Sequence, residues 1–205
     1  DFYWMVELPN QILFAVADCT GHGVPGAMVS VVCHSALNRA VKEFNLSSPA
    51  KILDKATEIV IETFEKSNAN IKDGMDIALC SFTKDKNELE YAGANNSIYL
   101  IRNGELKEFK SNKQPVGKFV NNQPFTNQQI KLEKNDSIYL FTDGYSDQFG
   151  GPKGKKYKYK AFKQMLTDIH QRAMNEQKQI ITKSFLDWQG NLEQIDDVCI
   201  VGIKI

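Results

Sequence analysis

Short segments with alternating apolar residues follow one another through the middle of the chain, and this pattern most constrains the fold. The strands it predicts cover residues 76–83, 88–93, 97–102, 105–110, 128–133 and 137–142. Two strands, over 2–8 and 12–17, are predicted before any helix, and another closes the chain over 198–205. Strands that follow one another directly pair antiparallel, whereas parallel strands need long crossovers. The sequence therefore predicts an α+β fold with mainly antiparallel sheets.

Helical patterns occur in pairs on either side of these strands. One helix is predicted over 24–44, and a second follows Ser48-Pro49, where Pro occupies the first helical position. Two amphipathic helices are predicted after residue 160, and a polar Gly/Lys loop precedes them. The Asn103-Gly104 pair predicts a tight hairpin. With no repeat and no clear linker, residues 1–205 are expected to form one domain.

Composition excludes some classes of function. Hydrophobic residues make up 42% of the chain, and Lys+Arg and Asp+Glu both number 25. This balance argues against nucleic acid or an anionic membrane as a partner. No apolar run approaches the length of a membrane span, and the scattered cysteines suit reduced thiols in a cytoplasmic protein. The chain begins at Asp1 inside a strand pattern, so we expect it to be a piece of a longer protein.

Aspartates stand at the ends of apolar runs that lie far apart in the sequence. Asp18 follows "ILFAVA", and Asp143 follows "SIYLF". Asp196 and Asp197 precede "VCIVGIKI", and Asp1 begins the first strand. A single Asp at such a place is often a turn former or a helix cap, so the argument rests on the set. If strand ends bring these carboxylates to one edge, each pair about 5 Å apart repels by roughly 3 kcal/mol. Mg²⁺ or Mn²⁺ would relieve that repulsion, because these ions prefer oxygen ligands.

Four motifs, taken in order, resemble one protein family over almost the whole chain. They are "ADCTGHGVPGAMVS", "YAGANNSIYLI", "LFTDGYSDQFGG" and "IDDVCIVGIKI", and the opening "DFYW" is similar to the end of a "GGDFYD" motif. The chain thus resembles the SpoIIE/RsbU-type branch of the PP2C-like (PPM) serine/threonine phosphatases. The resemblance implies an αββα sandwich, in which antiparallel helix pairs flank two mainly antiparallel sheets.

The resemblance also implies a site for two metal ions, Mn²⁺ or Mg²⁺. Asp18 would bridge the two ions, and Asp143 and Asp196 would complete one metal site. Asp1 and the backbone carbonyl of Cys19 would serve the other. Water activated at the metals would attack phosphorus directly, without a phosphoenzyme intermediate.

Supporting roles fall to Asp197, Gly21, His22 and Gly144. Gly21 lets the backbone pass close to the metals without a side-chain clash. A His two residues after the bridging Asp is implicated as a general acid in eukaryotic-type members, but that place is Thr20 here. His22 is displaced from that place by two positions. Two roles for His22 therefore stay open: it fixes the loop by hydrogen bonds, or it donates a proton.

The stretch Lys153–Lys160 is rich in lysine and follows Asp143 closely. One interpretation is a substrate flap in which Lys153, Lys155 and Lys156 meet an acidic or phosphorylated protein. The other is a solvated loop that leads into a helix.

The function implied is hydrolysis of phosphoserine or phosphothreonine on a signalling protein, of the STAS-type anti-anti-sigma class. The same resemblance implies an upstream sensor domain, homodimer formation and a cytoplasmic location, with any membrane tether outside this domain. Two alternatives stay open: a catalytically silent binding module of the same fold, and a hydrolase of small phosphoesters.

Overall fold

The computed structural model describes residues 1–21, 23–65 and 73–205. The chain divides into two compact units, each built on one antiparallel sheet. Unit 1 contains Asp1–Ser97 and Phe109–Leu132, and unit 2 contains Ile98–Glu108 and Glu133–Ile205. Each unit is described by itself below.

The sheet of unit 1 has the strand order β1-β2-β3-β4-β8, with β7 paired to β3. Its strands are β1 (Phe2–Glu7), β2 (Gln11–Cys19), β3 (Gly74–Thr83), β4 (Glu88–Ala94), β7 (Val116–Gly117) and β8 (Gln128–Lys131). All of these pairings are antiparallel. A short 3₁₀ helix, Lys84–Lys86, connects β3 to β4.

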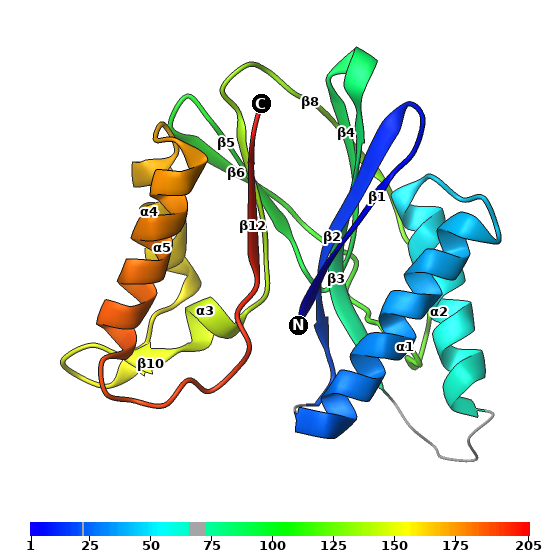
Figure 1. Cartoon of the computed structure of the whole chain (residues 1–205), viewed down its shortest axis with the longest axis horizontal. Helices are drawn as coiled ribbons and strands as arrows, with labels where there is room; N and C mark the ends of the chain where they lie inside the picture. Colours follow the sequence, from blue (N-terminus) through cyan, green and yellow to red (C-terminus); the bar gives the residue numbers. More distant parts are fainter. Residues whose placement is uncertain (22, 66–72) are drawn as a thin grey trace. The chain divides into compact units, whose positions relative to one another are not determined.

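Two helices, α1 (Gly23–Lys42) and α2 (Pro49–Glu65), pack side by side against this sheet (Figure 1). Pro49 is the first residue of α2, as the sequence predicts. Trp4 of β1 is buried among the α1 side chains, and its Nε1 donates to Asn38 Oδ1 at 3.1 Å. The indole is thus buried with its one polar atom satisfied, which fixes β1 against α1.

The sheet of unit 2 has the order β12-β9-β5-β6. Its strands are β5 (Ile98–Arg102), β6 (Glu105–Phe109), β9 (Ser137–Phe141) and β12 (Ile200–Lys204). The β5–β6 hairpin turns at Asn103 and Gly104, both with positive φ, at 52° and 80°. These values confirm the hairpin predicted from the Asn-Gly pair.

The helices of unit 2 are the one-turn α3 (Gly144–Asp147), α4 (Tyr159–Ile169) and α5 (Met174–Gln189). Between α3 and α4, β10 (Phe149–Gly150) pairs with β11 (Lys155–Lys156). The core of the unit is aromatic: Tyr145 and Phe162 pack at 4.9 Å between ring centroids. Among the described residues, no helix is both long enough and apolar enough to cross a membrane.

The predicted elements are present, and most of their boundaries differ from the prediction by one or two residues. β2 continues through Asp18 to Cys19, because its register with β3 extends to Met75. The last strand begins at Ile200 rather than at residue 198. The segment predicted as a polar Gly/Lys loop contains the β10–β11 hairpin, which is too short to show a strand period in the sequence.

An ion pair between Arg102 and Asp136 joins the end of β5 to the turn before β9. Arg102 donates from Nε to Asp136 Oδ1 at 2.9 Å and from Nη2 to Oδ2 at 2.6 Å. Only 1% of the Asp136 side chain is exposed. The pair is therefore a buried, bidentate link between two segments of unit 2.

We expect Arg102→Ala to lower the free energy of unfolding by about 3 kcal/mol, because it leaves a buried carboxylate without its cation. Urea denaturation measures this change. Arg39→Ala is the control, since Arg39 forms an exposed ion pair with Glu43 and should cost less than about 1 kcal/mol. Equal effects of the two substitutions would contradict the prediction.

Candidate active site

Acidic side chains lie opposite each other on two strands of unit 1, and a third acid directly precedes another strand. Asp18 of β2 is the register partner of Asp76 of β3. In the β1–β2 pairing Phe2 is opposite Ala17, and Asp1 is the residue before Phe2. Residues directly opposite in antiparallel strands have Cβ atoms about 5 Å apart, and like charges there are destabilising. This row of acids therefore suits a cation.

Asp76 is a residue that the sequence analysis did not single out. Its Oδ1 accepts a hydrogen bond from Asn95 Nδ2 at 2.8 Å, which orients the carboxylate. The signal that could have found it was present, because Asp76 begins an apolar strand as Asp1 does. The alternating pattern includes Asp76 in the predicted strand 76–83, so it does not stand outside an apolar run as Asp18 and Asp143 do.

The loop after Asp18 is held close to the start of β3. Thr20 Oγ1 donates to Asp73 Oδ1 at 2.9 Å and accepts from the Gly74 amide at 3.2 Å. Gly21 has a φ of +84°, and a Cβ on Gly26 would lie 2.6 Å from the Gly21 carbonyl oxygen. Only glycine fits this contact, so α1 begins directly against the loop. His22 lies outside the described residues, and its predicted role stays a prediction.

The Cys19 side chain packs in the core of unit 1 beside Cys33 of α1. A hydrogen bond with Cys33 lowers the pKa of the Cys19 thiol to about 7, although burial acts in the opposite direction. The same hydrogen bond, together with burial, raises the pKa of Cys33. The thiol is therefore engaged with α1, and the role of the Cys19 backbone carbonyl as a metal ligand stays a prediction.

Asp143 is the central acid of unit 2. It is the residue before the first turn of α3 and makes no side-chain capping hydrogen bond, and its buried Oδ1 has no hydrogen-bond partner among the described residues. Burial, followed by the charges of Asp147 and Asp196, raises the pKa of this carboxyl. The ionised form thus costs stability near neutral pH, and either protonation below the raised pKa or a bound cation removes that cost. An unpartnered carboxylate oxygen among acids fits a divalent cation.

Gly144 brings the Asp196-Asp197 segment close to Asp143. A Cβ at Gly144 would lie 2.0 Å from the Asp197 carbonyl oxygen, so any side chain there would displace the segment. Asp196 Oδ1 accepts from the Asp197 amide at 2.8 Å, and both residues are exposed. Unit 2 therefore brings together Asp143 and Asp196, which lie far apart in the sequence.

Each unit thus gathers some of the predicted ligands. Within the described residues of either unit, no three Asp, Glu, His or Cys side chains are close enough to hold a metal ion by themselves. The meeting of Asp1, Asp18 and Cys19 with Asp143 and Asp196 at one metal centre stays a prediction.

Of the three lysines predicted to line a flap, one is tied to the acids of unit 2. Lys156 of β11 forms an ion pair with Asp147, with 2.8 Å between Nζ and Oδ2. Lys153 and Lys155 are exposed, and neither forms an ion pair with a described residue. The role of these lysines in a flap stays a prediction.

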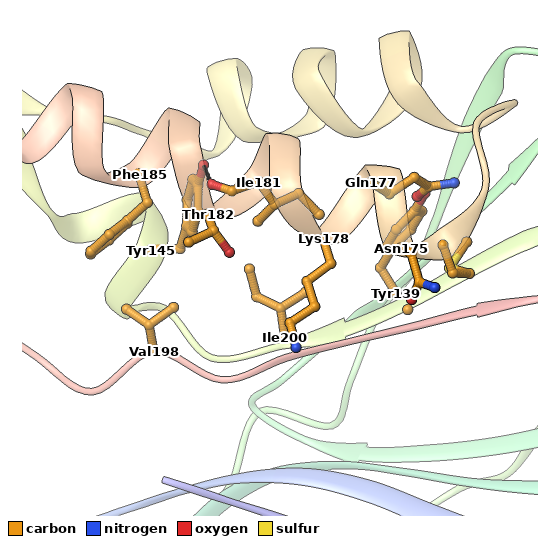
Figure 2. A pocket seen from close by; sticks show the side chains of 12 residues that line it. Tyr139, Tyr145, Asn175, Gln177, Lys178, Ile181, Thr182, Phe185, Val198 and Ile200 are labelled. Atoms are coloured by element: carbon orange, nitrogen blue, oxygen red, sulfur yellow. Dashed lines mark hydrogen bonds between the residues drawn. The ribbon is translucent and has the colours of Figure 1, made fainter.

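A separate cavity of about 490 Å³ lies in unit 2 between α5 and the strands β9 and β12 (Figure 2). Its walls are mostly aromatic and aliphatic, and no described carboxylate lines it. The Tyr139 hydroxyl donates to Gln177 Oε1 at 2.6 Å, and the Tyr145 hydroxyl donates to the Ile181 carbonyl at 3.0 Å. Both hydroxyls therefore have hydrogen-bond partners within the protein.

Comparison with known proteins identifies the family of this chain. The family model described as "Stage II sporulation protein E (SpoIIE)" matches residues 9–205. A search of curated proteins finds no match. Among solved structures, the SiaA-PP2C domain of Pseudomonas aeruginosa is 28% identical, with a TM-score of 0.90 over 100% of this chain and 80% of that chain.

Two other solved structures share the fold at lower identity. The PP2C phosphatase domain of SpoIIE from Bacillus subtilis, with a fragment of its regulatory domain, is 14% identical with a TM-score of 0.78. The RsbU and RsbW domains of a Mycobacterium tuberculosis protein are 19% identical with a TM-score of 0.79. All of this chain is covered in both comparisons, but only 58% and 54% of those chains. The chain belongs to the SpoIIE family and has the fold of a PP2C-type phosphatase domain.

Proposed function

We propose that this chain is a metal-dependent protein phosphatase that hydrolyses phosphoserine or phosphothreonine. The observation that supports this most directly is Asp143, whose buried Oδ1 has no partner while burial and neighbouring acids oppose its ionisation. A bound cation would offset the cost of ionising this buried carboxyl, and such perturbed acids are common at functional sites. The family and the carboxylate row of unit 1 support the same function.

The predicted ligands divide between two ions, Mn²⁺ or Mg²⁺. Asp18 would serve both ions, Asp143 and Asp196 would hold one, and Asp1 with the Cys19 carbonyl would hold the other. When bound, divalent ions activate water for attack on phosphorus and neutralise charge on the phosphoryl oxygens. Asp76 lies opposite Asp18 and would orient it or add an oxygen ligand. Both units would together form one catalytic domain over residues 1–205.

The substrate we propose is a phosphorylated STAS-type protein, with the domain as the output of an upstream sensor in the same cytoplasmic polypeptide. Similarity to RsbU domains and to a structure from the bacterial stressosome, a modular system adapted to control secondary messenger signalling, supports a regulatory role. A solved structure of RsbX contains magnesium, and it shares the fold at 14% identity. A homodimer, which the resemblance to this family implies, stays a prediction.

We expect Asp18→Asn and Asp143→Asn each to lower Mn²⁺-dependent phosphate release by at least about 100-fold, because each removes a charge that would hold the metals. Phosphate release from a phosphoserine protein, with and without chelator, measures this effect. Circular dichroism checks the fold. Asp168→Asn is the control, since this acid lies in α4 and accepts only a surface hydrogen bond from Gln164. Turnover unchanged by either site substitution would refute the assignment.

Gly144→Ala tests whether the close contact with Asp197 holds the metal ligands together. The added Cβ cannot fit 2.0 Å from a carbonyl oxygen, so the Asp196-Asp197 segment must move away from Asp143. We expect Mn²⁺ affinity to fall about 10-fold or more, as for other residues that orient metal ligands. Isothermal titration calorimetry measures the affinity. Gly190→Ala is the control for backbone strain alone, because its φ of +56° disfavours a side chain while a Cβ there meets no atom within 4 Å. Wild-type affinity in Gly144→Ala would show that this contact does not orient a ligand.

A further inference from the structure

The two adjacent lysines of β11 lie in different surroundings. Lys155 and Lys156 pair with Gly150 and Phe149 of β10, and neighbouring residues of a strand point to opposite faces. Lys156 Nζ lies 2.8 Å from Asp147 Oδ2 and 5.9 Å from the centroid of the Phe149 ring. Lys155 forms no ion pair with a described residue. The hairpin therefore presents one lysine to the acids and one to solvent.

The ion pair places Lys156 on the Asp143 side of α3. The Asp147 amide donates to the Asp143 carbonyl at 3.0 Å, so the two residues are one helical turn apart. Side chains four residues apart lie on the same helix face. Lys156 and Asp143 also interact electrostatically, and the ammonium favours the ionised form of the carboxyl. The ammonium is thus near enough to interact with the acid that we assign to the metal.

The backbone around Lys156 is tied down on both sides. After the lysine, the Tyr157 amide donates to the Gln148 carbonyl at 3.0 Å, and the Lys158 amide donates to the Ser146 carbonyl at 2.7 Å. Before it, the Gly151 amide donates to the Trp188 carbonyl at 2.7 Å. Trp188 Nε1 in turn donates to the Gln148 carbonyl at 3.1 Å. These bonds fix the hairpin to α3 and α5, so Lys156 has a defined position.

We propose that Lys156 binds the phosphoryl group of the substrate beside Asp143 and positions it for attack. This inference rests on the proposed phosphatase function and adds a residue to it. An ammonium has three donors, and Asp147 occupies only one of them. Because 43% of the side chain is exposed, a phosphate monoester can reach the remaining donors. Asp147 positions the lysine. In this proposal Lys153 and Lys155 do not bind the phosphoryl group and contact at most the surface of the substrate protein.

Binding of inorganic phosphate to the Mn²⁺-loaded protein tests the proposal without requiring turnover. We expect Lys156→Ala to raise the dissociation constant for phosphate, measured by calorimetry, about 10-fold or more. The reason is the loss of one hydrogen bond between charged groups. The KM for p-nitrophenyl phosphate should rise by a similar factor. Lys156→Arg should restore most of both, because guanidinium also binds phosphate. The melting temperature should stay near that of the wild type, because exposed ion pairs add little stability.

Two control lysines distinguish phosphoryl binding from a general basic surface. Lys183 of α5 forms an exposed ion pair with Asp187, with 2.7 Å between Nζ and Oδ2. Lys183→Ala should leave phosphate binding unchanged. Lys155→Ala should affect at most the KM for the phosphoprotein. The proposal is overturned if Lys156→Ala binds phosphate as the wild type does, or if Lys155→Ala weakens binding equally. Absence of turnover in the wild type would count against the proposed function, while phosphate binding would still decide the role of Lys156.

Discussion

Repulsion among carboxylates is the constraint on which the site of this protein depends. Asp18 and Asp76 lie opposite each other on neighbouring strands, and Asp143 lies near Asp147 and Asp196. Like charges directly opposite on paired strands are destabilising, and a domain of this kind is stable by only about 5–15 kcal/mol. This repulsion supports the proposal that divalent ions bind these acids.

Local sequence signals predict most of the fold. Alternating apolar residues identify the strands, and the Asn103-Gly104 pair identifies a hairpin whose φ values require those residues. Pro49 begins α2 because its ring suits the first helical turn. The β10–β11 hairpin is different, because its strands have two residues each and are held by hydrogen bonds to Trp188 and Gln148. Bonds between distant residues leave no period in the sequence.

The candidate site is predictable only in part, for related reasons. Acids beside apolar runs indicate Asp18 and Asp143, but the register between β2 and β3 is needed to see that Asp76 is opposite Asp18. The sequence also cannot separate Lys156 from its neighbours Lys153 and Lys155. Their chemistry is the same, and the difference comes from the ion pair with Asp147 in a helix of a single turn.

The contact between the β10–β11 hairpin and Trp188 limits how far the hairpin can move by itself. A Cβ on Gly150 would lie 1.9 Å from the Trp188 carbonyl oxygen, so the hairpin backbone lies directly against the end of α5. The hairpin cannot swing like a lid unless α5 shifts with it. The phosphorylated protein that we propose as substrate would therefore meet a surface that is already ordered, so its binding would lose little further conformational entropy there.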